Sequence, residues 1–132
     1  MNCIDVVCAV IERQGKVLCM RRKNRGAAST AGLFEFPGGK IEAGETPFEA
    51  IVREIREELE WEVTPLELLA TVTHEYPEFT IRLTAVRCGI SDDAEPVLHD
   101  HDDYRWLVPA ELPSLNWAAA DSRLIDKLIL QR

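Results

Sequence analysis

Apolar residues recur at three- and four-residue steps from Phe48 to Leu59, and this period predicts an amphipathic helix. Thr46 is the expected N-cap of the helix and Pro47 its first residue. Glu49, which follows the cap at the N3 position, completes a capping box. One face of this helix is therefore expected to pack against a core, while the other face carries charged side chains.

Runs of apolar and β-branched residues on both sides of this helix predict strands. The expected strands span residues 3–11, 17–21, 33–37, 63–76, 79–88 and 104–108. A turn at 13–16 joins the first two strands into a hairpin, and a second helix, with Asp121 as its N-cap, follows the last strand. This order predicts an α+β fold, an α/β/α sandwich with a mixed β-sheet between helices, in one domain over residues 1–132.

The composition of the chain limits the classes of partner that the protein is expected to bind. The chain has 132 residues and a net charge of −8, which argues against direct binding to nucleic acid. Its first residues show neither a basic lead-in nor a long apolar run, so we expect no signal peptide, no membrane contact and a cytoplasmic protein. The four cysteines (Cys3, Cys8, Cys19 and Cys88) lack CxxC spacing and are expected to be reduced and mostly buried.

Three glutamates of the predicted helix stand close together on its polar side. Glu54, Glu57 and Glu58 fall within about 60° of one another on a helical wheel, so their carboxylates share one ridge. Like charges at this spacing destabilise a helix. The ridge is therefore either a solvated glutamate-rich face or a site for a hard divalent cation such as Mg²⁺ or Mn²⁺, which prefers oxygen ligands.

The spacing of charges around this ridge forms a longer motif. The segment from Gly39 to Trp61 resembles the Nudix box, G-x5-E-x7-R-E-U-x-E-E-x-G-U with U an aliphatic residue, and matches it at every charged position. Glu60 stands where the family has glycine, and Trp61 where it has an aliphatic residue. Because a helix-ending glycine commonly adopts a positive φ, Glu60 is expected to cost about 1 kcal/mol there or to end the helix differently.

The resemblance implies the Nudix fold and a site for Mg²⁺, with Mn²⁺ as an alternative. The implied metal ligands are the Gly38 carbonyl, Glu54, Glu57, Glu58 and Asp100. MutT-like members of the family place an acid six residues before a strand tryptophan, which selects Asp100 here and leaves Asp102 as the alternative. Glu54 is the favoured general base, with Asp100 second. Arg53 is expected to orient the glutamates, with Glu45 as its other partner.

The resemblance also implies a nucleotide-binding surface ahead of the helix. Glu35, Phe36, Pro37 and Gly38 are expected to line it. Arg22 is expected to contact phosphate, although the basic cluster around it is equally consistent with a solvated strand end.

Two further polar positions have competing interpretations. Asp121 reads the edge of the base or serves only as an N-cap, and the two roles are compatible. His99 and His101 flank Asp100, but no third nitrogen or sulfur ligand is placed nearby, so we expect surface histidines rather than a zinc site.

By this resemblance the protein is expected to be a Mg²⁺-dependent nucleoside triphosphate pyrophosphohydrolase. The reaction converts a nucleoside triphosphate and water to the monophosphate and pyrophosphate, with 8-oxo-dGTP or another non-standard nucleotide as the substrate to be removed. CTP or dCTP is the alternative substrate, and a non-catalytic nucleotide-sensing module is the alternative of another class. The expected partner is a small-molecule nucleotide, and the protein is expected to be a monomer or homodimer.

Overall fold

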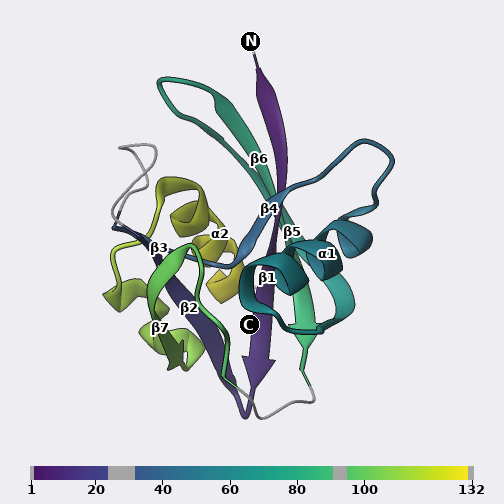
Figure 1. Cartoon of the computed structure of the whole chain (residues 1–132). Coiled ribbons are helices and arrows are strands. Elements are labelled where there is room, and N and C mark those ends of the chain that lie inside the picture. The colour runs from purple at the N-terminus through teal and green to yellow at the C-terminus, as the bar shows by residue number, and fades with distance from the viewer. Residues whose placement is uncertain (1, 24–31, 91–94, 131–132) are drawn as a thin grey trace.

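The computed structural model of the chain describes residues 2–23, 32–90 and 95–130 (Figure 1). Its elements, in chain order, are β1 (Cys3–Arg13), β2 (Lys16–Arg22), β3 (Phe34–Glu35), β4 (Gly38–Lys40), α1 (Pro47–Leu59), β5 (Thr64–Glu75), β6 (Thr80–Gly89), β7 (His101–Leu107), a 3₁₀ helix (Pro109–Ser114) and α2 (Ala119–Leu130).

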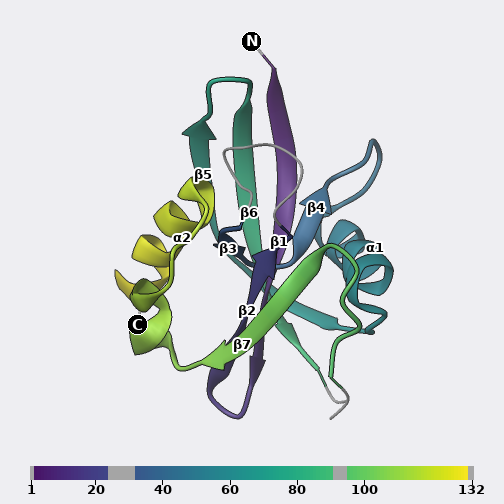
Figure 2. The ribbon, with the colours of Figure 1, turned by 60° about the vertical axis from the view of Figure 1, so that its left-hand side comes forward.

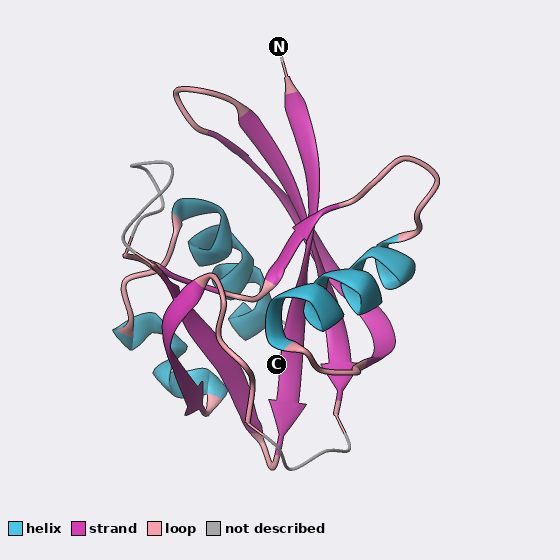
Figure 3. Ribbon diagram, in the orientation of Figure 1, coloured by secondary structure: helices cyan, strands magenta, loops and turns pink. Residues whose placement is uncertain are grey.

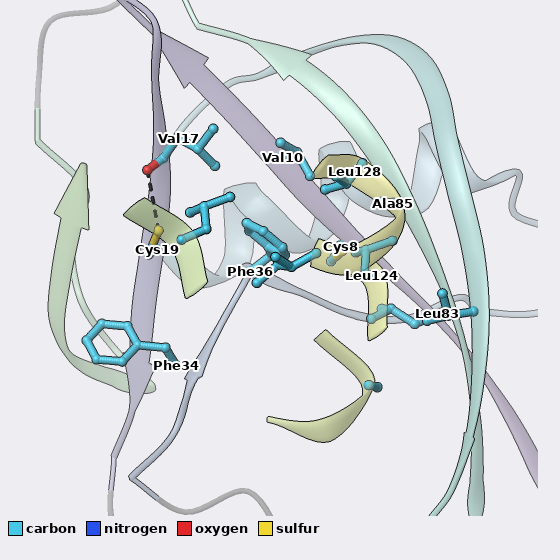
Figure 4. Packing of buried hydrophobic residues seen from close by; sticks show 14 of the residues in the cluster. Cys8, Val10, Val17, Cys19, Phe34, Phe36, Leu83, Ala85, Leu124 and Leu128 are labelled. Atoms are coloured by element: carbon cyan, nitrogen blue, oxygen red, sulfur yellow. Dashed lines mark hydrogen bonds between the residues drawn. The ribbon is translucent and has the colours of Figure 1, made fainter. Parts of the chain in front are cut away.

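Two helices cover opposite faces of one mixed sheet (Figures 2 and 3). Because successive side chains of a strand point to opposite faces, β1 serves both cores: Val7, Ala9 and Ile11 pack toward α1, whereas Cys8 and Val10 pack toward α2. Figure 4 shows the second group, with Cys8 and Val10 beside helix residues such as Leu124. The predicted α/β/α sandwich is confirmed.

The central strand β1 has a different partner along each part of its length. It pairs in parallel with β6 from Cys3 to Glu12 on one edge. On its other edge it meets β2 only at the tight turn, where Gln14 and Gly15 have positive φ values of 55° and 78°. Farther along this edge β4 takes the place of β2, pairing antiparallel with Val6–Cys8. The predicted hairpin therefore opens, and β2 pairs instead with β3 and β7.

The structure corrects three boundaries. Of the strand expected at 33–37 only Phe34–Glu35 forms a strand, β3, and a separate strand, β4, begins after Pro37. The last strand begins at His101 rather than Tyr104. Helix α2 begins at Ala119, so Asp121 lies within its first turn and the prediction that it is the N-cap is wrong. Residues 91–94 of the acid-rich segment lie outside the described residues.

All four cysteines are free, and only Cys3 among them is exposed. Within the described residues, the model contains no helix with the length and apolar character needed to cross a membrane.

Candidate active site

Helix α1 begins with the expected capping box. The Glu49 amide donates to Thr46 Oγ1 at 3.1 Å, and the Thr46 amide donates to Glu49 Oε1 at 2.9 Å. Burial of Ile51, Ile55 and Leu59 then fixes which face of the helix meets the sheet. The charged side chains of α1 are consequently presented along β4 and the loop before the helix.

Arg53 gathers the carboxylates at one end of this polar face. Its guanidinium donates to both oxygens of Glu45, at 2.7 and 2.8 Å, and to Glu54 Oε1 at 2.8 Å. It also reaches Glu57 Oε2 at 3.3 Å and the Lys40 carbonyl at 3.0 Å. The hydrogen bonds from Arg53 hold the pKa of Glu45 near 2, so this loop carboxylate stays ionised.

The two glycines of β4 permit a close approach between this strand and its neighbours. A Cβ atom at Gly39 would collide with the carboxyl group of Glu54, and one at Gly38 would collide with the Val7 carbonyl oxygen. A larger residue at Gly38 would therefore displace the backbone of β1, and one at Gly39 would displace the Glu54 carboxyl group. The glycines bring the backbone of β4 and the glutamate of α1 to one place.

Glu58, on the same helix, lies in a separate polar cluster. His101 Nε2 is 2.9 Å from Glu35 Oε2, and Arg22 donates to both Glu35 oxygens at 3.2 and 2.9 Å. Glu58 Oε2 is 3.9 Å from His101 Nδ1, which is too long for a hydrogen bond. Only 1% of His101 is exposed, so the expectation that both histidines lie on the surface is wrong for this one.

Burial and nearby charges shift the pKa values of the two glutamates of this cluster in opposite directions. Burial and the nearby charges of Glu35 and Glu54 raise the pKa of Glu58 to about 8. Burial also opposes ionisation of Glu35, but the hydrogen bond from His101 and the charge of Arg22 outweigh it and lower the pKa of Glu35. Glu35 is thus the ionised partner of Arg22, and Glu58 is the carboxyl group without a compensating cation.

The residues at the junction of α1 and β4 fit a divalent cation. Across the described ranges, no three His, Cys, Asp or Glu side chains already converge as a finished metal cage. However, Glu58 Oε2 is buried and has no hydrogen-bond partner among the described residues, and Gly39 leaves space for the carboxyl group of Glu54. A hard cation bound there would be the positively charged partner that the buried Glu58 oxygen lacks.

The remaining predicted ligands are arranged less tightly. Glu57 is largely exposed, with a side-chain accessibility of 60%. Asp100 is exposed, yet its charge acts on Glu58 and Arg22, so it lies at the rim of the same cluster. The alternative acid Asp102 instead accepts a hydrogen bond from Arg21 at 2.7 Å on the exposed side of β7.

A cavity of about 380 Å³ opens beside these carboxylates. Five residues predicted for substrate binding line it: Arg22, Glu35, Phe36, Gly38 and Asp121. The sixth, Pro37, is fully buried beside them, and its carbonyl accepts a hydrogen bond from Ala9. Tyr76 and Phe79 add aromatic surface to the wall. The volume is within the range of small-molecule sites.

Asp121 supplies a polar group in the floor of this cavity. The Phe36 amide donates to Asp121 Oδ2 at 3.0 Å, which ties α2 to the segment between β3 and β4. Burial, followed by the charge of Glu35, raises the pKa of Asp121 to about 8. At neutral pH this side chain is therefore mainly a neutral carboxylic acid, with one donor and one acceptor.

Glu60 ends α1 in the left-handed conformation expected of the family's glycine, with φ 57° and ψ 36°. His99 Nε2 lies 2.7 Å from Glu60 Oε2, and the Val97 amide donates to the Leu59 carbonyl at 3.1 Å. These contacts fasten the segment that leads to Asp100 to the end of the helix.

Comparisons with known proteins agree with this architecture. Residues 6–127 match the family described as NUDIX domain. The CTP pyrophosphohydrolase of Escherichia coli (strain K12) is 37% identical over 134 residues, covering 100% of this chain and 96% of that protein. The 8-oxo-dGTP diphosphatase of Proteus vulgaris is 49% identical over 53 residues, covering 40% of this chain and 47% of that protein.

A solved structure extends the likeness to the whole fold. The solution structure of the E. coli ORF135 protein has a TM-score of 0.83 at 37% identity, and the match covers 100% of this chain and 92% of that one. Because the family match covers most of the chain and a full-length relative shares more than a third of its residues, this chain belongs to the NUDIX domain family.

Proposed function

We propose that this protein is a Mg²⁺-dependent nucleoside triphosphate pyrophosphohydrolase, with Mn²⁺ able to replace Mg²⁺. The observation that carries the proposal is the junction at Gly38 and Gly39, where the wall of the cavity meets the carboxyl group of Glu54 on α1. A nucleotide whose base occupies the cavity can extend its phosphates from there along the glutamates of the helix.

The reaction is attack of water on one of the two phosphorus atoms that flank the α–β bridging oxygen. The bond from that phosphorus to the bridging oxygen breaks, and the products are a nucleoside monophosphate and pyrophosphate. When bound, the cation orients the water, lowers its pKa and offsets charge on the phosphate oxygens. Glu54, Glu57, Glu58, the Gly38 carbonyl and Asp100 are the proposed ligands.

Glu54 is the proposed general base, which accepts the proton of the attacking water. Arg53 keeps one oxygen of Glu54 fixed at 2.8 Å and thus orients the carboxylate. Asp100 is the second candidate. Replacing Asp100 by Asn should lower kcat without unfolding the protein, whereas Asp102→Asn, at the exposed acid paired with Arg21, should leave the rate unchanged. The opposite pattern would transfer the role to Asp102.

The state of Asp121 favours 8-oxoguanine nucleotides over those of guanine. A neutral carboxylic acid donates one hydrogen bond and accepts another. The edge of 8-oxoguanine offers the O6 acceptor next to an N7–H donor, while guanine offers two acceptors there, as in the DNA major groove. At this edge, Asp121 can therefore pair fully with 8-oxoguanine but not with guanine.

Cytosine nucleotides are the second candidate substrate. Neutral Asp121 also matches the amino donor and ring-nitrogen acceptor of cytosine, and the full-length relative from E. coli is named a CTP pyrophosphohydrolase. Both candidates use the same cavity and the same cleavage chemistry.

The proposal is tested by incubating the protein and Mg²⁺ with 8-oxo-dGTP, dGTP, CTP and dCTP, and measuring pyrophosphate and orthophosphate separately. We expect pyrophosphate with the monophosphate, faster turnover of 8-oxo-dGTP than of dGTP, and no turnover with EDTA. Release of orthophosphate would place the cleaved bond elsewhere. Tight nucleotide binding without turnover would identify a sensing module.

A further inference from the structure

Among the described residues that line the cavity, Tyr76 carries the only hydroxyl group. This residue directly follows β5, and α2 lies against that strand (Figure 2). Its ring contacts those of His74 and Phe79, with centroid distances of 4.6 and 5.5 Å, and only 9% of the residue is exposed. These contacts fix the position of the ring and therefore that of its hydroxyl oxygen.

The hydroxyl oxygen of Tyr76 serves the start of α2. The Ala120 amide donates a hydrogen bond to Tyr76 Oη at 3.2 Å. Amide groups in the first turn of a helix have no acceptor within the helix, and Ala118, the residue before α2, has no side chain that could accept from them. Tyr76 therefore supplies, from another element, the acceptor that an N-cap side chain would otherwise provide.

The hydroxyl proton of Tyr76 is not used in this contact. An amide can only donate, so the bond from Ala120 occupies a lone pair of Oη and leaves the O–H group free to donate. Within the described part of the chain, no acceptor receives that proton. Burial raises the pKa of Tyr76, which keeps the proton in place at neutral pH. Because a buried donor without an acceptor is costly, a ligand in the cavity gains affinity by accepting this hydrogen bond.

We propose that the Tyr76 hydroxyl is a specificity-determining group that donates a hydrogen bond to a carbonyl oxygen of the nucleobase, beside the two positions that pair with Asp121. The phosphates extend toward Gly39 and Glu54, whereas the hydroxyl is bonded to the residue next to Asp121, so the base is the part of the nucleotide that meets it. The proposal rests on the function proposed above, because it requires a nucleotide with its base in this cavity.

Both candidate bases carry an acceptor where this donor requires one. On cytosine, the amino group and the ring nitrogen that match Asp121 are followed along the edge by the carbonyl oxygen O2. On 8-oxoguanine, O6 and N7–H are followed by O8, whereas guanine has a C8–H group there. One hydroxyl donor beside a neutral carboxylic acid is therefore complementary to both candidate bases, and it disfavours guanine at a second point.

Replacing the acceptor oxygen by sulfur tests this contact, because a thiocarbonyl is a poorer hydrogen-bond acceptor than a carbonyl. We would measure kcat/KM for CTP against 2-thio-CTP, and for 8-oxo-dGTP against 8-thio-dGTP, in the unmodified protein and in Tyr76→Phe. Tyr104→Phe is the matched control. It removes the other tyrosine hydroxyl of the chain, on a half-buried ring that packs in the core on the α1 side of the sheet.

The preference for oxygen over sulfur should depend on Tyr76. In the unmodified protein and in Tyr104→Phe, the ratio of kcat/KM values should exceed that in Tyr76→Phe by about 2- to 10-fold, the effect of one hydrogen bond. Loss of the Ala120 contact affects all substrates alike, so it cancels within each ratio. An unchanged ratio in Tyr76→Phe, with or without a uniform loss of rate, would overturn the proposal and leave Tyr76 as a cap of α2. Absence of turnover of every nucleotide by the unmodified protein would instead refute the proposed function.

A measurement on the unmodified protein gives an independent answer if Tyr76→Phe does not fold. The ¹³Cζ resonance of a tyrosine responds to hydrogen bonds of its hydroxyl. With Mg²⁺ present, α,β-methylene dCTP or the corresponding 8-oxo-dGTP analogue, whichever binds more tightly, should shift the Cζ resonance of Tyr76. Methylenediphosphonate, which has no base, should not shift it, and Tyr104 should respond to neither ligand. A Tyr76 resonance that stays constant in the nucleotide-saturated protein would overturn the proposal.

Discussion

The polar face of α1 has two contrasting parts. Around Arg53, the carboxylates of Glu45, Glu54 and Glu57 all receive hydrogen bonds from one guanidinium. Near the other end of the helix, Glu58 is half-buried, and its buried Oε2 has no hydrogen-bond partner among the described residues. The difference separates two uses of acidic residues: Arg53 holds the first part in place, and the second part is the one that the proposed cation would complete.

Replacing Glu58 by Gln should give the largest effect. The variant should lose at least about 100-fold in Mg²⁺-dependent kcat, the scale of removing one contact to developing charge. Its melting temperature should stay constant or rise, because Gln keeps the shape of the neutral acid without the cost of ionisation. Activity assays and thermal melts check both parts.

Glu62→Gln provides the control, because Glu62 is an exposed glutamate paired with Arg56 and should tolerate the change. Full activity in the Glu58 variant would remove this carboxylate from the catalytic site.

Replacing Arg53 by Lys should lower kcat by about 10- to 100-fold, since an ammonium group cannot bridge three carboxylates in one fixed geometry. The same variant should melt at a lower temperature, because Glu45 and Glu54 lose their shared partner. Arg56→Lys, at an exposed pair on the same helix, is the matched control. Equal activity of the two variants would show that Arg53 does not orient the glutamates.

Asp121 should affect the pH dependence of stability. Its pKa is raised from the ordinary value of 3.8 to about 8 in the folded protein, so the unfolded chain releases this proton first. The free energy of unfolding should therefore fall between about pH 4 and pH 8, by up to about 1.4 kcal/mol per pH unit. Asp121→Asn should make that fall less steep, while Glu58 continues to contribute a slope of the same sign.

Urea titrations at several values from pH 5 to pH 8 measure this slope. Asp126→Asn, at an exposed position of the same helix, should reproduce the slope of the unmodified protein. A parallel curve for Asp121→Asn would mean that Asp121 ionises normally in the folded state.

The smallest effect is expected at the end of α1. Glu60→Gly should raise the free energy of unfolding by up to about 1 kcal/mol, because glycine adopts the left-handed conformation without steric cost. Loss of the exposed contact with His99 should offset little of this gain. Glu60→Ala retains the strain and loses the contact, so it should be less stable than either. Melting temperatures in the reverse order would contradict this account.

The first part of the polar face, around Arg53, could be predicted from the sequence because its contacts join residues that are close in the chain. Helix geometry mainly determines three of its features. These are the capping by Thr46 and Glu49, the apolar period of α1 and the spacing of Arg53 from its carboxylates. The end of the helix at Glu60 is also a local property, and the structure places that residue in the left-handed region.

The second part depends on pairings between distant segments. His101 is buried only because a bulge between β2 and β7 turns it inward, and nothing in the His-Asp-His spacing reveals that register. Asp121 fails as an N-cap for a similar reason. Backbone hydrogen bonds tie Phe34 to Asn116 and Ala118, and α2 begins directly after that contact.

The parallel pairing of β1 with β6 has a consequence for how the chain folds. It joins Cys3 to Thr80 and continues to Glu12 and Gly89, across the whole of α1 and β5. Such non-local contacts require closure of a long loop before they stabilise anything, so they slow folding relative to a helical bundle of similar size. β4 pairs with the opposite edge of β1, so the glycines beside Glu54 reach their positions only when β1 is also in place. Acquisition of metal binding should therefore follow the assembly of β1 with β4 rather than the formation of α1 alone.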